Sequence, residues 1–175
     1  MSMERDDQPI INRVEASDLV TLDLAKRWEV PAFIEVDLAG HLWEGWVLRE
    51  REFREALRLW DAATYGGKHV ALFCSSDAIL PDWAWMLTTS RLVALGATVQ
   101  MGTAEEVKNQ WIVDQIRHLN PEEFRDAKLV IKGCSGLGGA QALGALVQQL
   151  QPVTASMLYG EPCSTVPIWK RPATR

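Results

Sequence analysis

The stretch "KLVIKGCSGLGGAQ" (128–141) contains the pattern of a strand, a glycine-rich loop and the start of a helix. The run "KLVIK" (128–132) is short and apolar between two lysines, which predicts a buried strand. The glycines end this strand, and "AQALGALVQQL" (140–150) predicts the helix that follows. Cys134 therefore stands where a buried strand ends, and this position bears on both the fold and the candidate site.

The same strand–helix unit occurs twice before this stretch. The run "HVALFC" (69–74) is continuously apolar, as expected of a strand covered on both faces, and a helix follows in 81–95. The strand "ATVQMG" (97–102) precedes a helix that begins with the capping box "TAEE" (103–106). A last strand is predicted in "TASMLYG" (154–160). Such alternation builds a parallel sheet with helices on both faces.

The first third of the chain has a different pattern. Apolar and polar residues alternate in "LVTLDL" (19–24) and "FIEVDL" (33–38), which is typical of antiparallel strands with one exposed face. A weaker strand is predicted in 41–48, followed by a helix over 49–63. The sequence thus predicts an α/β fold: a mostly parallel open sheet with helices on both faces, and antiparallel strands in its N-terminal part, at or near an edge.

Length and composition indicate one ordinary globular domain. The chain has 175 residues, of which 47% are hydrophobic and 23% charged. No Pro- or Ser-rich linker divides it, so we expect a single α/β domain over residues 10–168. Residues 1–9 are expected to form a loose N-terminus, and residues 169–175 a loose C-terminal tail.

Charge and cysteine content exclude several classes of protein. The net charge is −5 and no cluster of Lys and Arg is present, which argues against nucleic-acid binding. No apolar run approaches the roughly 20 residues that cross a membrane, and "MSMERDDQ" (1–8) does not resemble a secretion signal. Three cysteines, an odd number, favour a reducing cytoplasm over a disulfide framework.

Each of the three cysteines follows a predicted strand and precedes a serine: Cys74, Cys134 and Cys163. Parallel strands end at one carboxyl edge of their sheet, where ligands bind in open α/β folds. We therefore expect the three thiols to meet there. Thiolates favour iron–sulfur clusters, zinc or other soft metals, and three of them leave one position for a further ligand. His41 is the candidate for that position.

Two other interpretations remain open at this point. Cys134 alone could act as the nucleophile of a thiol enzyme or a sulfur carrier, because Lys132 and a helix start would stabilise its thiolate. Further candidates for contacts with a cofactor stand next to the cysteines: Gly133, Ser135, Asp77 and Glu161. Alternatively, the thiols are small core residues, and the eight tryptophans serve packing or self-association into a homo-oligomer.

Three motifs resemble a bacterial family known as domain of unknown function 2480: "ALFCSSDAILPDWAWML", "VIKGCS" and "LYGEPCSTVPIWK". The resemblance runs from "IINRV" near residue 10 to "PIWKRP". Members tend to be encoded beside genes of the SUF-type iron–sulfur assembly system. The resemblance thus implies a cytosolic protein that binds a cluster or partners iron–sulfur assembly proteins, without an established catalytic residue. The matching positions are Cys74, Asp77, Lys132, Gly133, Cys134, Glu161, Pro162, Cys163 and Ser164.

Overall fold

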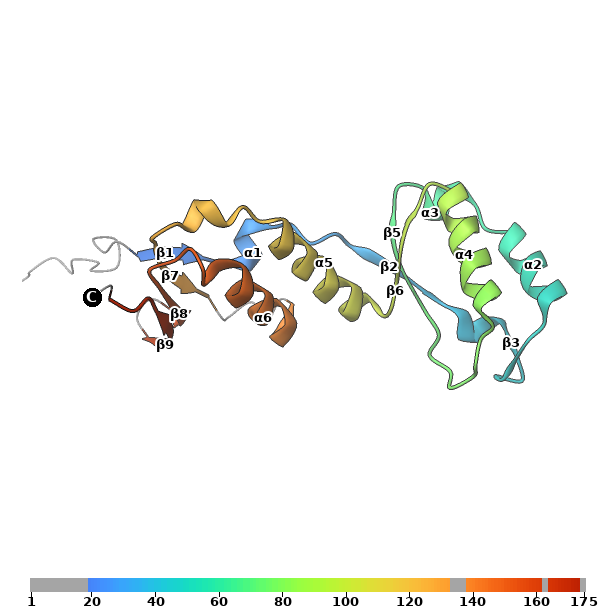
Figure 1. Ribbon diagram of the computed structural model, residues 1–175. Helices are drawn as coiled ribbons and strands as arrows, with labels where there is room; N and C mark the ends of the chain where they lie inside the picture. The colour runs from blue at the N-terminus through green and yellow to red at the C-terminus, as the bar shows by residue number, and fades with distance from the viewer. Residues whose placement is uncertain (1–18, 133–137, 162–163, 174–175) are drawn as a thin grey trace, which may run out of the picture. The chain divides into compact units, whose positions relative to one another are not determined.

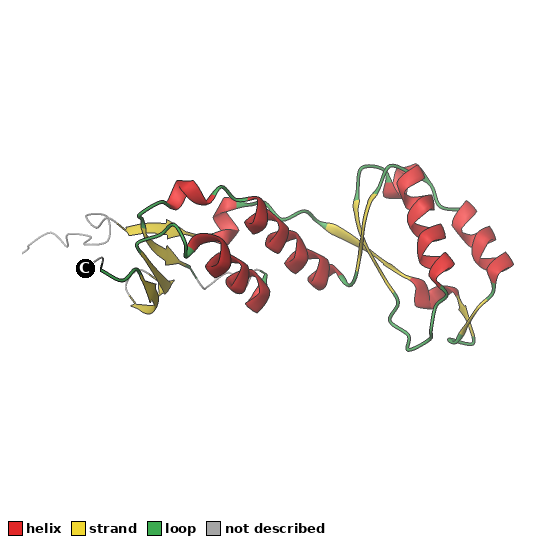
Figure 2. Cartoon of the chain, viewed as in Figure 1, coloured by secondary structure: helices red, strands yellow, loops and turns green. Residues whose placement is uncertain are grey.

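Parallel pairing organises the two larger sheets of the protein (Figures 1 and 2). The computed structural model describes residues 19–132, 138–161 and 164–173. One sheet has the order β1-β7-β8-β9, formed by β1 (Leu19–Leu22), β7 (Lys128–Ile131), β8 (Ser156–Glu161) and β9 (Ser164–Lys170). The other has the order β2-β5-β6, formed by β2 (Phe33–Asp37), β5 (His69–Phe73) and β6 (Thr98–Met101).

The remaining elements are one short hairpin and the helices. The hairpin pairs β3 (Leu42–Trp43) with β4 (Val47–Leu48) in antiparallel fashion. The α-helices are α1 (Leu24–Arg27), α2 (Glu50–Arg58), α3 (Ala62–Tyr65), α4 (Asp82–Ala94), α5 (Ala104–His118) and α6 (Gly139–Leu150). Two 3-10 helices, η1 (Leu38–His41) and η2 (Pro121–Phe124), complete the set. Within the described ranges, no helix has the length and apolar character that crossing a bilayer requires.

Residue contacts divide the chain into two compact units. The first unit contains the four-stranded sheet and, of the described residues, 19–28, 116–132, 143–161 and 164–173. The second contains the three-stranded sheet and residues 29–115 and 138–142. Among the described residues, the boundary between Trp28 and Glu29 lies between α1 and β2, and the other two lie inside α5 and α6. The single domain over 10–168 stays a prediction. The loose N-terminus predicted for residues 1–9 lies outside the described residues.

The predicted α/β class, with parallel open sheets and an antiparallel element in the N-terminal part, is confirmed. The predicted direction of the first two strands is wrong, because β1 pairs in parallel with β7 and β2 pairs in parallel with β5. Both are edge strands of their sheets. Alternating polar and apolar residues indicate that one face of a strand is exposed. An edge strand can have such a face whether it pairs in parallel or antiparallel fashion, so the alternation did not specify the direction.

The first residues of the predicted loose tail, 169–175, belong to a strand. Residues 164–170 form β9, antiparallel to β8. Arg171 continues the attachment, since its backbone N–H donates to the Ala155 carbonyl at 2.9 Å and its side chain forms an ion pair with Asp126. Pro167 argued against a strand in the sequence, because proline interrupts the hydrogen bonds of a sheet and is tolerated mainly on edge strands and at bulges. Both conditions hold here: β9 is an edge strand, and its register with β8 shifts beside Leu158.

Arg91 of α4 ties the end of α2 to the core of the second unit. Its Nε donates to the Leu57 carbonyl at 3.0 Å, and its Nη2 donates to the carbonyls of Arg58, at 3.2 Å, and Trp60. The last carbonyls of a helix lack partners within the helix, so a cation there satisfies hydrogen bonds and complements the dipole. Phe53 and Leu57 bury the inner face of the same helix.

We expect Arg91→Met to lower the free energy of unfolding by about 1.5–3 kcal/mol, because the carbonyls that accept hydrogen bonds from the guanidinium would lose their charged donor. Urea denaturation measures the change. Arg51→Met is the matched control, since the Arg51 side chain is 90% exposed, and it should change stability by no more than about 0.5 kcal/mol. Equal effects of the two substitutions would show that Arg91 has no special structural role.

Candidate functional site

The carboxyl ends of β7 and β8 lie side by side. The two strands are adjacent and parallel, with Ile131 opposite Tyr159. Lys132 follows β7 and Glu161 ends β8, and Lys132 Nζ lies 3.2 Å from Glu161 Oε2, with both side chains partly exposed. The Lys132 backbone N–H also donates to the Leu22 carbonyl of β1 at 2.9 Å. Two of the residues predicted for the site therefore meet at this edge of the four-stranded sheet.

Cys134 and Cys163 lie outside the described residues, as do Gly133 and Ser135. In sequence, each of the two cysteines is two residues beyond a member of the Lys132–Glu161 ion pair. The described residues that precede the two cysteines therefore lie together at one edge of the sheet. That their thiols meet stays a prediction.

Cys74 belongs to the other sheet. It follows β5 in the second unit, where it is half-buried and packs against a hydrophobic cluster that includes Leu72 and Leu80. The expectation that all three cysteine-bearing strands share one sheet is thus wrong, because β5 lies in the three-stranded sheet and β7 and β8 in the four-stranded one. A continuous apolar run identifies a strand buried on both faces, but it does not specify its sheet.

The serine next to Cys74 fastens the end of β5 to β2. The Ser75 backbone N–H donates to Asp37 Oδ1 at 3.0 Å, and its hydroxyl donates to Oδ2 at 2.5 Å. Burial by itself raises the pKa of the Asp37 carboxyl, but these bonds and one from the Ala39 N–H outweigh it and lower the pKa below its ordinary value. Sequence reasoning missed Asp37, although an acidic residue at a strand end is a recognisable signal for such a fastening.

Asp77 and His41, two other predicted site residues, also belong to the second unit. Asp77 is exposed in the loop after β5. The His41 ring packs in an edge-to-face arrangement against Phe53, with 5.4 Å between ring centroids, and its centroid lies 6.0 Å from that of Trp60. These contacts give His41 a place in aromatic packing, and its role as a metal ligand stays a prediction.

The family comparison agrees with the motifs around these strand ends. The model of a family described as "Protein of unknown function (DUF2480)" matches residues 8–171. The chain belongs to the DUF2480 family. The match covers all three cysteines and confirms the resemblance seen in the sequence, while the family description names no chemistry. No curated protein and no solved structure matches the chain.

Metal binding by this DUF2480 chain stays a prediction. Among the residues that the structure describes, no three His, Cys, Asp or Glu side chains gather so that they could hold a metal ion. Cys74, Asp77 and His41 are therefore insufficient as a site by themselves. Cys134 and Cys163, the other two predicted metal ligands, lie outside the described ranges.

Gly138, from the glycine-rich loop, serves close packing. It has a φ of +76°, and its backbone N–H donates to Asn109 Oδ1 at 3.1 Å. A Cβ at this position would lie 2.3 Å from the Cβ of Ala142 and 2.9 Å from Cγ2 of Ile112. The loop thus needs glycine here for backbone conformation and for helix contact, without reference to a bound anion.

Gly138→Ala should lower the free energy of unfolding by about 1–3 kcal/mol, because the methyl group overpacks the contact and the backbone is left-handed. Thermal or urea denaturation gives the value. Gly144→Ala is the control: it lies within α6, and a Cβ there meets nothing within 4 Å. It should raise stability by up to about 1 kcal/mol. The same sign for both substitutions would contradict this account of Gly138.

His41 makes stability depend on pH. Burial lowers the pKa of its imidazole below 6.5, so the folded state favours the neutral ring. The neutral His41 ring contributes fully to the free energy of unfolding when the pH is above the ordinary pKa of histidine. This contribution is lost as the pH falls toward the lowered pKa of the folded state. We expect the native chain to lose more stability than His41→Phe between about pH 7.5 and about pH 5, measured by urea denaturation at each pH. Equal losses of stability in the native chain and in His41→Phe would exclude His41 as the cause of the pH dependence.

Proposed function

We propose that the protein binds a soft metal ion or an iron–sulfur cluster through cysteine thiolates at the carboxyl ends of β7 and β8. The observation that supports the proposal is the Lys132–Glu161 ion pair across two adjacent parallel strands. In sequence, Cys134 follows Lys132 by two residues and Cys163 follows Glu161 by two, and the proposal is that both thiols lie at this edge. Ligands of open α/β folds bind at such edges.

Thiolates are soft ligands that favour zinc and iron–sulfur clusters. Two thiolates do not complete a four-coordinate site, so further ligands are required. Cys74 is the remaining cysteine and His41 the remaining predicted ligand. A bound cluster or metal would hold the ends of β7 and β8 together, which links metal binding to the stability of the four-stranded sheet.

The Lys132–Glu161 pair weighs against the alternative of a thiol enzyme or sulfur carrier. A nucleophilic Cys134 would need positive charge nearby to favour its thiolate at neutral pH. Lys132 is the predicted source of this charge, and its ammonium group lies 3.2 Å from a carboxylate, which offsets its field. A metal ion supplies the stabilisation of a thiolate directly.

Purification under anaerobic conditions, followed by iron, zinc and sulfide analysis, tests the proposal. Iron with equal sulfide identifies a cluster, and zinc without sulfide identifies a mononuclear site. Cys134→Ser and Cys163→Ser should each lower metal content about tenfold or more, because each removes a direct ligand. Metal-free native protein that also takes up nothing on reconstitution would overturn the proposal.

Cys74→Ser is the matched substitution, since it removes the one cysteine of the other sheet. Unchanged metal content would assign the site to the edge of β7 and β8 alone, and an equal loss would make Cys74 a third ligand. Measuring the rate of thiol alkylation as a function of pH distinguishes metal binding from the alternative of a thiol enzyme or sulfur carrier. One fast-reacting thiol with a lowered pKa in metal-free protein would favour a nucleophilic Cys134.

A further inference from the structure

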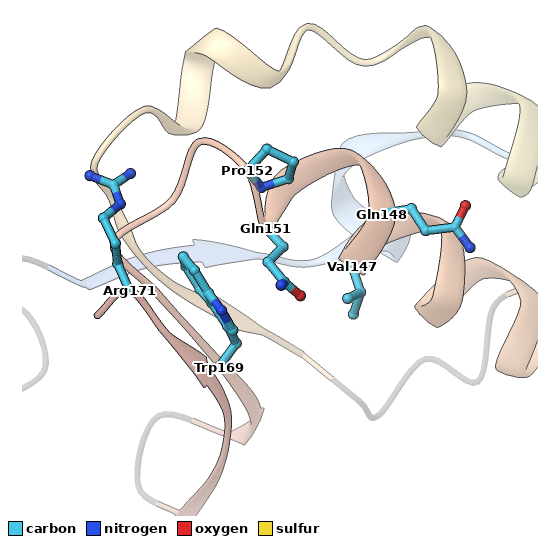
Figure 3. Close-up of a pocket in the computed structure, with 6 residues that line it drawn as sticks. All are labelled: Val147, Gln148, Gln151, Pro152, Trp169 and Arg171. Carbon is cyan, nitrogen blue, oxygen red and sulfur yellow. The ribbon is translucent and has the colours of Figure 1, made fainter. Parts of the chain in front are cut away.

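A hollow opens between the end of α6 and the end of β9, away from the cysteine-bearing strand ends (Figure 3). Its volume is about 440 Å³, in the range of small-molecule sites. All of its lining residues belong to the unit with the four-stranded sheet. They are Val147, Gln148, Gln151, Pro152, Trp169 and Arg171.

Trp169 forms the aromatic wall of this hollow. It is half-buried in β9, opposite Met157 of β8, which is fully buried. The pairing holds the tryptophan backbone on a rigid element, so the position of the indole is set by the sheet. Val147 and Pro152 add apolar surface from α6 and the turn after it. An indole face with apolar neighbours favours a flat ring stacked upon it.

Gln151 places a hydrogen-bonding amide group next to the indole. Figure 3 shows its side chain extending into the space between Trp169 and Val147. Within the described part of the chain its amide has no hydrogen-bond partner, whereas the amide of Gln149 donates to the Leu119 carbonyl at 3.1 Å. A primary amide offers both a donor and an acceptor, which is the complement of the edge of a nucleobase.

Arg171 adds no net charge to the hollow. Its guanidinium forms an ion pair with Asp126, and its Nη2 donates to the carbonyls of Val153, at 2.7 Å, and Thr154, at 2.8 Å. These partners satisfy the cation within the fold. An anionic ligand group would therefore gain little here. Of the described residues, no carboxylate lines the hollow to bind sugar hydroxyls or an amine.

We infer that this hollow binds a neutral, planar nitrogen heterocycle of the nucleobase type, stacked on Trp169 and hydrogen-bonded to Gln151. The inference is independent of the proposed metal site, since the described lining residues include none of the predicted metal ligands. It predicts selectivity for the ring over any phosphate attached to it, because Arg171, the cation among the described lining residues, is already paired with Asp126.

Titration of the ¹⁵N-labelled full chain with adenosine, adenosine 5′-monophosphate and methyl glucoside tests the inference. The indole N–H signals of the eight tryptophans can be followed separately, and Trp169→Phe assigns one of them. We expect that signal to shift with adenosine and with its monophosphate, with Kd values within about twofold of each other, and not to shift with the glucoside.

Substitutions separate stacking from hydrogen bonding. Trp169→Ala should raise the Kd for adenosine about tenfold or more, and Gln151→Leu about fivefold, since the latter keeps the ring and removes the amide. Gln151→Leu leaves the sheet untouched, so it tests the site even where Trp169→Ala unfolds the chain. Trp46→Ala is the control, because Trp46 is 66% exposed on another element, and it should leave the Kd unchanged.

Three outcomes would overturn the inference. The first is no shift of the Trp169 signal with adenosine. The second is a Kd that Gln151→Leu leaves unchanged, or that Trp169→Ala leaves unchanged in a folded chain. The third is binding of the monophosphate more than about tenfold tighter than adenosine, which would show that a cation of the protein recognises the phosphate.

Discussion

The burial of β7 between two parallel neighbours is the constraint on which the candidate site depends. Leu129 and Val130 are fully buried and Ile131 is nearly so, and these residues pair with β1 on one side and β8 on the other. A strand buried in this way cannot slip by one residue, because slippage would turn each side chain to the opposite face. The fixed register brings Lys132 next to Glu161. The pairing therefore sets where the last described residues before Cys134 and Cys163 lie.

The central strands and their helices could be predicted because they carry strong local signals. Continuous apolar runs identified β5 and β7, and the capping box Thr103–Glu106 identified the start of α5, where Thr103 and Glu106 do exchange the expected hydrogen bonds. Pairing partners carry no such signal. The alternation of polar and apolar residues in β1 reflects its position at the edge of the sheet. The proline in β9 argued against a strand there, although an edge strand tolerates proline. The division into two sheets depends on contacts between residues far apart in sequence, which periodicity does not report.

The candidate site shows the same limit. Sequence reasoning correctly placed Cys74, Lys132 and Glu161 at or just beyond strand ends. It could not tell that the strand before Cys74 belongs to a different sheet from the strands before Cys134 and Cys163. The serine after Cys74 illustrates why a shared motif need not mean a shared role. Ser75 is bonded to Asp37 of β2, so its hydroxyl is explained by the attachment of two strands within the three-stranded sheet.

The hairpin of β8 and β9 separates the two proposed sites of the four-stranded sheet. Glu161 pairs with Ser164 at one end of the hairpin, and Met157 pairs with Trp169 near the other. Five residue steps along a strand cover about 17 Å, so a ligand stacked on Trp169 cannot also contact a metal at the edge beside Glu161. The two sites also differ in chemistry, because one relies on soft thiolates and the other on an indole and a neutral amide. Evidence for one is therefore not evidence for the other, and any coupling between them would have to pass through the pairing of β8 with β9.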